Sequence, residues 1–117
     1  MTILILDDNL LWTSRLTRSA QALGHSPTVA KTLPAARFDV AILNLGRPEF
    51  SSPQVIGELR GRGTYLIGHA GHKEKDLLNE GTANGVDQVV SNSSLTFKLA
   101  DILAKIPSDF SPPARLN

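Results

Sequence analysis

Short apolar runs that alternate with amphipathic segments restrict this chain to few folds. The clearest runs cover residues 2–6, 39–45 and 64–69, and shorter stretches over 26–30 and 86–90 continue the alternation. A short, continuous apolar run is typical of a strand that is buried on both faces of a parallel sheet. We therefore predict strands over residues 2–6, 26–30, 39–45, 64–69 and 86–90.

The segments between these runs carry helix signals. Trp12, Leu16 and Ala20 recur at helical spacing ahead of Gly24, a typical residue for a helix C-terminus. Ser52 followed by Pro53 is typical of a helix N-terminus. We predict helices over residues 10–23, 53–60, 73–83 and 95–106, the last with Ser93 or Ser94 as its cap and Pro107 at its end.

The segment between the second and third strands is too short for an ordinary crossover helix. Only Lys31 to Phe38 remain there, with Pro34 in the middle. This leaves room for about one or two helical turns. We expect the second helix to be short or absent.

Strands that alternate with helices predict an α/β protein with helices on both faces of a parallel sheet. In such folds, ligands bind at the carboxyl ends of the strands. The residues that close the strands are therefore the candidate site: Asp7, Asp8, Asn44, His69, Ser91 and Asn92.

Composition sets further limits. The 117 residues fit one domain, and 12 Lys plus Arg against 11 Asp plus Glu leave a net charge of +1, which argues against a nucleic-acid-binding surface. The absence of cysteine excludes disulfides and thiolate catalysis. No apolar run approaches the roughly 20 residues of a membrane span, and the start is unlike a signal peptide, so we expect a cytoplasmic protein. We expect a folded domain over 1–106 and a flexible tail over 107–117.

Three motifs resemble the receiver domain of bacterial response regulators. They are the acidic pair Asp7-Asp8 after the first strand, N-L-G-R-P over 44–48 at the end of the third, and G-V-D-Q-V-V-S-N-S over 85–93. The resemblance covers about residues 2–106. It implies a flavodoxin-like fold with strand order 2-1-3-4-5 and a role in two-component phosphorelay signalling. In this family a histidine kinase passes a phosphoryl group to an aspartate at the end of the third strand.

Most of the family's phosphorylation residues are replaced. Asp7 and Asp8 match the acidic pair that helps to hold Mg²⁺. The phosphoacceptor aspartate lies four residues before a proline, and Asn44 holds that position here. The family's Thr or Ser falls on His69, and its lysine falls on Asn92. The chain is identified as an atypical member, a pseudo-receiver that lacks the phosphoacceptor aspartate.

These replacements remove the chemistry that the family performs. An uncharged amide is a very poor nucleophile for phosphoryl transfer. Mg²⁺ prefers carboxylate oxygens, so a site with only Asp7 and Asp8 binds it weakly at best. We expect no catalytic residue and no cofactor. The pocket is then a degenerate phosphorylation site formed by Asp7, Asp8, Asn44, His69 and Asn92.

Simpler roles for the same residues remain open. Asp7 and Asp8 fit a helix cap, and Asn44 and His69 fit hydrogen-bonded structural positions. Two adjacent carboxylates also favour a nearby cation, for which Arg47 and a protonated His69 are the candidates. If protonated His69 is that cation, the pocket responds to pH near neutrality.

The leading functional hypothesis is a stand-alone, phosphorylation-independent receiver-like module that binds another signalling protein or a second copy of itself. One alternative is an active phosphorelay member that uses Mg²⁺ at Asp7 and Asp8 or uses His69. Another is a small-molecule binder at the strand-end crevice. No direct nucleic-acid or membrane contact is expected, because the charge is balanced and no output domain follows Pro107. The resemblance implies a partner-binding face with Lys73, Glu74, Asp76, Asn79, Glu80, Gln88 and Lys98.

Overall fold

A computed structural model of the chain describes residues 1–107, and its centre is one parallel sheet. The five strands lie in the order β2-β1-β3-β4-β5, which confirms the predicted flavodoxin-like topology. Their bounds are Thr2–Leu6 (β1), Ser26–Ala30 (β2), Val40–Asn44 (β3), Tyr65–Ala70 (β4) and Gln88–Ser91 (β5).

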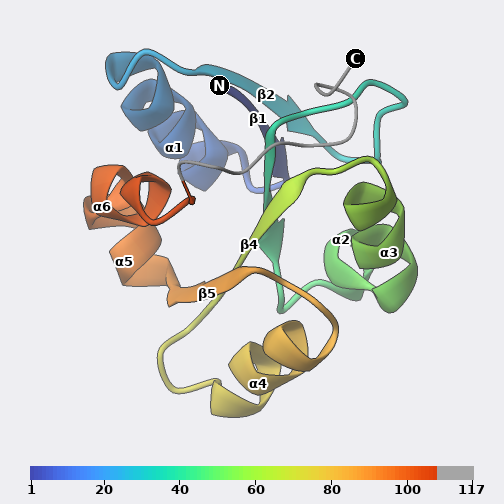
Figure 1. Ribbon diagram of the computed structural model, residues 1–117. Coiled ribbons are helices and arrows are strands. Elements are labelled where there is room, and N and C mark those ends of the chain that lie inside the picture. The colour runs from blue at the N-terminus through green and yellow to red at the C-terminus, as the bar shows by residue number, and fades with distance from the viewer. Residues whose placement is uncertain (108–117) are drawn as a thin grey trace.

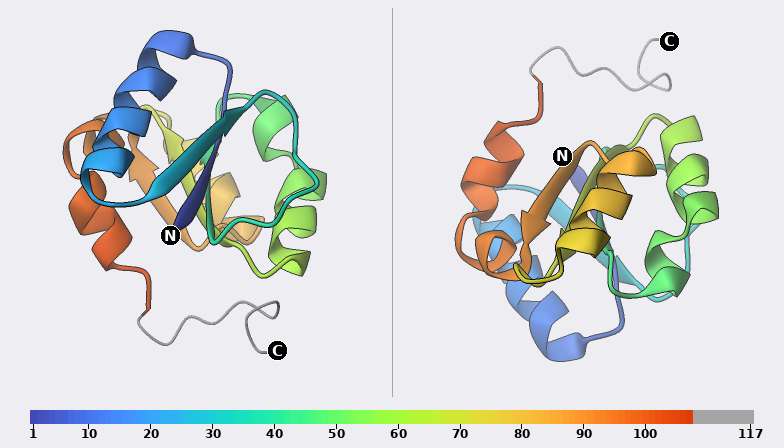
Figure 2. Two further views of the ribbon diagram at one scale, coloured as in Figure 1. Left: turned by 90° about the horizontal axis from the view of Figure 1, so that it is seen from above. Right: turned by 90° about the horizontal axis from the view of Figure 1, so that it is seen from below.

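Helices cover both faces of the sheet (Figures 1 and 2). On one face lie α1 (Leu10–Ala22), α5 (Asn92–Phe97) and α6 (Leu99–Ala104). On the other lie α2 (Pro48–Ser51), α3 (Pro53–Gly61) and α4 (Lys75–Ala83). Among residues 1–107, no helix is both long and apolar enough to cross a lipid bilayer.

Successive side chains of each inner strand enter opposite halves of the core. In β1, Ile3 and Ile5 pack toward α1, whereas Leu4 and Leu6 pack toward α3. All four are buried, because both faces of the strand are covered. This two-sided burial explains the continuous apolar runs in the sequence.

Polar caps set the starts of three helices. Asn9 Oδ1 accepts a hydrogen bond from Trp12 N and caps α1, so the interpretation of Asp7-Asp8 as the cap was wrong. Ser52 caps α3 through Val55 N, as predicted. Ser91 caps α5, not Ser93 or Ser94, because its hydroxyl accepts from Ser94 N.

The predicted helix over 95–106 is two helices separated at Lys98. Lys98 has φ −130° and ψ 33°, outside the helical range, so the helical backbone stops there and restarts at Leu99. Leu95, Leu99 and Leu103 are nevertheless all buried in the same half of the core. The apolar spacing correctly predicted which residues are buried. The same residues can be buried without an unbroken helix.

No helix connects β2 to β3. Residues 31–39 cross the sheet as an irregular segment, which settles the expectation of a short or absent helix. Hydrogen bonds hold its backbone, with Arg62 Nη1 donating to Pro34 O at 2.6 Å and Thr64 Oγ1 donating to Phe38 O at 2.8 Å. Leu33 packs against the core beneath it.

Smaller shifts affect other predicted bounds. The helix predicted from residue 73 begins at Lys75, and the strand predicted from 86 begins at Gln88. Apart from Pro107, the tail predicted over 107–117 lies outside the described residues.

Candidate functional site

The carboxyl ends of four strands meet around a small cavity. β1 leads into Asp7, β3 ends at Asn44, β4 carries His69, and β5 leads into Asn92. Asn44 and His69 are register partners on neighbouring strands. The cavity has a volume of about 150 Å³ and is lined by Asp7, Asn9, Trp12, Asn44, His69 and Asn92. The structure therefore brings together four of the five pocket residues named from the sequence, and Asp8 is not part of the lining.

A hydrogen bond joins Asp7 and Asn44, which both line this cavity. Asp7 is only 2% exposed, and its Oδ1 accepts a hydrogen bond from Asp8 N at 2.8 Å. Its Oδ2 accepts from Asn44 Nδ2 at 3.3 Å. Asn44 Oδ1 in turn accepts from Gly46 N at 2.9 Å. Both ends of the Asn44 amide are thus satisfied, and the Nδ2 contact to Asp7 is one that a carboxylate at position 44 could not make.

Asp8 is paired outside the cavity with Arg47. Nη1 and Nη2 of Arg47 donate to Oδ1 and Oδ2 of Asp8 at 2.8 and 2.9 Å. Arg47 Nε also donates to Glu49 Oε1 at 2.7 Å. The hydrogen bonds from Arg47 lower the pKa of Asp8, and those to Asp8 and Glu49 raise the pKa of Arg47. Of the two cations that the sequence suggested, Arg47 therefore neutralises this carboxylate.

His69 does not act as the second cation, and that hypothesis is wrong. His69 is buried, with an exposed fraction of only 3%. Burial lowers the pKa of His69, and the opposing effects of the bond to Asn92 and the charge of Asp7 are smaller. Its Nδ1 lies 2.7 Å from Asn92 Oδ1 and not against a carboxylate. Burial therefore favours the neutral imidazole, and no ion pair joins His69 to a carboxylate among residues 1–107.

The neutral tautomer of His69 follows from its partner. Because the Asn92 oxygen only accepts, Nδ1 carries the proton and Nε2 is a bare acceptor. Nε2 is buried and has no hydrogen-bond partner among the described residues. The ring stacks on Trp12, with centroids 4.5 Å apart and an angle of 26° between the planes. This stacking fixes the imidazole at the wall of the cavity.

The acidic pair is a poor fit for Mg²⁺. Both oxygens of Asp8 are occupied by the Arg47 guanidinium, whose positive charge also opposes a metal ion at that position. Within residues 1–107, no group of three or more His, Asp or Glu side chains is arranged to hold a metal.

The predicted partner face runs across β5 between α4 and α5 (Figure 1). Lys73, Glu74, Asp76, Asn79, Glu80 and Lys98 are exposed, as a contact surface requires. Gln88 differs, because it is only half-exposed and its Oε1 accepts a hydrogen bond from Tyr65 OH at 3.1 Å. The Gln88 side chain is therefore already bonded to Tyr65, which is 7% exposed.

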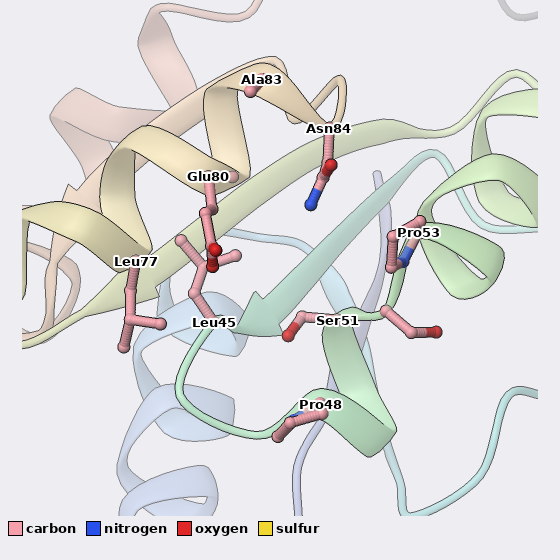
Figure 3. Close-up of a pocket in the computed structure, with 10 residues that line it drawn as sticks. Leu45, Pro48, Ser51, Pro53, Leu77, Glu80, Ala83 and Asn84 are labelled. Atoms are coloured by element: carbon pink, nitrogen blue, oxygen red, sulfur yellow. The ribbon is translucent and has the colours of Figure 1, made fainter.

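A second and larger hollow lies beside this face. It has a volume of about 440 Å³ and separates the C-terminal half of α4 from α2 and the start of α3. Figure 3 shows Leu45 at its floor, Glu80 and Asn84 projecting from α4, and Pro48 and Pro53 on the opposite wall. Glu80 thus belongs both to the exposed face and to this groove.

Two cavity residues were missed from the sequence. Asn9 was available as a signal, because it directly precedes the first apolar-periodic residue and is a favoured cap. Trp12 was assigned to the helix's buried stripe, and it does pack against the core. Its ring also covers His69, a contact between sequence-distant residues that periodicity does not reveal.

Comparison with solved structures places this fold among receiver domains. A response regulator from Burkholderia pseudomallei, solved with a phosphorylated aspartic acid, calcium ion and citrate, matches with a TM-score of 0.74 at 17% identity, over 92% of this chain and 66% of that one. A two-component response regulator from Clostridium difficile matches with a TM-score of 0.72 at 16% identity, over 92% and 99% of the two chains. A CheY-like receiver domain protein from Methanospirillum hungatei JF-1 gives 0.68 at 16% identity, over 88% and 93%.

The sequence itself gives no such match. No protein-family model matches the chain, and no curated protein matches it. The likeness therefore establishes the receiver-domain fold, and the chemistry of the pocket rests on the residues that this chain places there.

Proposed function

We propose that this protein is a receiver-like signalling module that works without phosphorylation, through binding to another protein. The observation that carries the proposal is Asn44 at the tip of β3, hydrogen-bonded on both sides of its amide. The neutral amide of Asn44 is a very poor nucleophile toward phosphoryl donors. The receiver-domain fold supports a role in two-component signalling in the cytoplasm.

The remaining pocket groups support the absence of phosphoryl transfer. Asp8 is held in a two-point ion pair by Arg47. Asp7 is only 2% exposed, and His69 Nε2 is fully buried. These features disfavour the phosphorelay alternative through the acidic pair or through His69.

Unpaired charges support protein binding through the α4–β5–α5 face. None of Lys73, Asp76, Glu80 and Lys98 forms an ion pair within the part of the chain that the structure describes. Exposed charges of both signs favour a partner with a complementary pattern and fix its orientation. The partner is another signalling protein or a second copy of this chain.

Charge reversal on this face tests the proposal. The tagged protein is used to capture partners from extracts of its native host, and the captured proteins are quantified by mass spectrometry. The double variant Lys73→Glu, Glu80→Lys is expected to lose at least about ten-fold of the specific capture, or about 1.4 kcal/mol. Arg18→Glu, an exposed charge on α1, is the matched control and should retain it.

Two further readouts complete this test. Sedimentation of the purified protein shows whether the partner is a second copy, which the same double variant should then dissociate. Acetyl phosphate should leave capture unchanged. Capture that is insensitive to the double variant, or equally reduced by Arg18→Glu, would contradict the assignment of the face.

A further inference from the structure

We propose that the outer face of α1, together with Phe97 at the end of α5, binds the surface of membranes that contain anionic lipids. This inference goes beyond the proposed function, because none of its residues belongs to the predicted partner face. Three features support it: exposed apolar side chains, arginines without ion pairs, and the shape of the surface between the two helices.

The most exposed large apolar side chains of residues 1–107 lie on these two helices. Leu10 and Leu11, in the first turn of α1, are 69% and 78% exposed, and Phe97 is 80% exposed. The next most exposed is Leu23, at 43%. Contact of such side chains with water is unfavourable, and this cost is removed when they enter an apolar phase.

The arginines of α1 differ from the others in the described part of the chain. Arg15 and Arg18 are exposed and form no ion pair among residues 1–107. The other arginines of that range all form ion pairs: Arg37, Arg47, Arg60 and Arg62. α1 itself contains no acidic residue. Of the acidic side chains closest to it and to Phe97 in the sequence, Asp8 is bound to Arg47, and Asp101 on α6 offsets only one positive charge.

The apolar and basic side chains form one surface. Leu11, Arg15 and Arg18 follow at intervals of four and three residues, so they share one face of α1. Arg15 and Thr96 line the same narrow seam between α1 and α5, and Thr96 directly precedes Phe97. Figure 1 shows both helices on the same side of the sheet. Arg15 therefore connects Leu11 with Phe97.

A fluid bilayer fits this surface better than a folded protein does. The seam between α1 and α5 has no room for a water molecule, so it offers no hollow for a side chain of a partner. Lipids rearrange around protruding side chains and need no such hollow. Exposed Leu and Phe that enter the boundary between head groups and acyl chains, beside arginines that bind lipid phosphates, are typical of peripheral membrane binding.

The balanced charge of the whole chain does not argue against this surface. The expectation of no membrane contact was based on a net charge of +1, which is an average over all faces. The helices on the opposite face of the sheet, α2, α3 and α4, carry several of the acidic side chains: Glu49, Glu58, Asp76 and Glu80. The fold therefore separates these acidic side chains from Arg15 and Arg18.

Flotation with lipid vesicles tests this inference directly. The protein is mixed at low ionic strength with vesicles of phosphatidylcholine that contain about 30% phosphatidylglycerol, or with vesicles of phosphatidylcholine alone. At least about ten-fold more protein should bind per lipid to the anionic vesicles. Salt at about 0.5 M should release most of it, because it screens the attraction between arginine and lipid.

Two double variants identify the surface. Arg15→Gln, Arg18→Gln should reduce binding to anionic vesicles by about ten-fold or more. Leu11→Ser, Phe97→Ser keeps the charge and should also reduce binding, by about ten-fold, because the apolar side chains no longer enter the bilayer. Lys75→Glu on α4 is the matched control. It changes the net charge as much as the arginine pair does and should bind as the wild type does. All five side chains are exposed, so the variants should fold.

Equal binding to both kinds of vesicle, or wild-type binding by either double variant, would overturn the inference. An equal loss in Lys75→Glu would also overturn it, because net charge alone would then explain the binding. If Leu11→Ser, Phe97→Ser loses a captured protein while the wild type binds no vesicles, the surface binds a protein and the inference is wrong. Lys73→Glu, Glu80→Lys should leave vesicle binding unchanged, which separates a failure of this inference from a failure of the proposed function.

Discussion

Asn44 and its neighbours determine which hydrogen bonds and which charges the pocket contains. The amide donates to Asp7 and accepts from Gly46 N, so it joins the ends of β1 and β3 without adding charge. Arg47 then neutralises the one exposed carboxylate of the acidic pair. The pocket is held together by hydrogen bonds around one buried carboxylate, that of Asp7.

The Asp8–Arg47 pair makes a testable prediction about one carboxyl group. In the wild type, the hydrogen bonds from Arg47 hold the pKa of Asp8 below its ordinary value. In Arg47→Gln, NMR titration of the Asp8 carboxyl carbon should show this pKa returning toward about 3.9. Arg15→Gln, on the exposed face of α1, is the control. An unchanged Asp8 pKa in Arg47→Gln would show that the ion pair does not persist in solution.

Buried neutral His69 predicts how stability depends on pH. Burial lowers the folded-state pKa of His69, so the unfolded chain binds a proton more readily. Above about pH 6.5, His69 should not lower the free energy of unfolding. Below that pH, the free energy of unfolding should decrease as pH falls through the folded-state pKa. His25 contributes in the same direction, because burial and the adjacent N-terminal amino group lower its pKa.

Urea unfolding at about pH 7.5 and about pH 5.5 separates the two histidines. The loss of stability on acidification should be smaller in His69→Gln than in the wild type. His25→Gln, the matched control, should retain the part that belongs to His69. An identical pH dependence in His69→Gln and the wild type would contradict the buried neutral assignment.

Residue types at strand ends could be predicted from the sequence, and their pairings could not. The rule that ligands bind at the carboxyl ends of parallel strands was enough to name Asp7, Asn44, His69 and Asn92. The choice between Arg47 and His69 as the cation depended on burial. His69 lies beneath Trp12, and this contact depends on the packing of α1 against β4.

At the scale of elements, α4 approaches the sheet closely because Gly81 has no side chain. A Cβ at Gly81 would lie 2.9 Å from Leu45 Cδ1 and 3.2 Å from Val89 Cγ1. Gly57 in α3, by contrast, has nothing within 4 Å of its Cβ position. Substitution by alanine is therefore expected to change the free energy of unfolding in opposite directions at the two glycines.

Gly81→Ala should lower the free energy of unfolding by about 1 kcal/mol, since overpacking of about 1–3 kcal/mol exceeds the gain in helix propensity of about 1 kcal/mol. Gly57→Ala should raise it by about 0.5–1 kcal/mol, because only the propensity changes. Chemical denaturation of both variants measures the difference. A stabilised Gly81→Ala would show that Leu45 moves aside and that α4 is not held against it.

Elements were predictable where burial follows a simple period. The five strands and the starts of α1 and α3 came from apolar runs and caps. The break at Lys98 was not predictable, because Leu95, Leu99 and Leu103 are buried on both sides of it. The length of the crossover over 31–39 indicated only that a helix there is short or absent. Its anchoring could not be predicted, because Arg62 lies 28 positions away from Pro34 in the sequence.

At the scale of the whole molecule, a receiver-domain fold carries an asparagine, Asn44, at the end of β3. The sheet order and the two helical layers are those of the receiver domains that it resembles in structure. Under the proposed function, binding of a partner protein shifts the equilibrium between states of the domain.

The most direct measurement is the intact mass of the protein after incubation with acetyl phosphate and Mg²⁺, with a phosphorylatable receiver domain labelled in parallel. The proposed function predicts an unmodified mass for this chain while the other domain gains one phosphoryl group. A stoichiometric gain of one phosphoryl group, mapped to Asp7, Asp8 or His69, would contradict it.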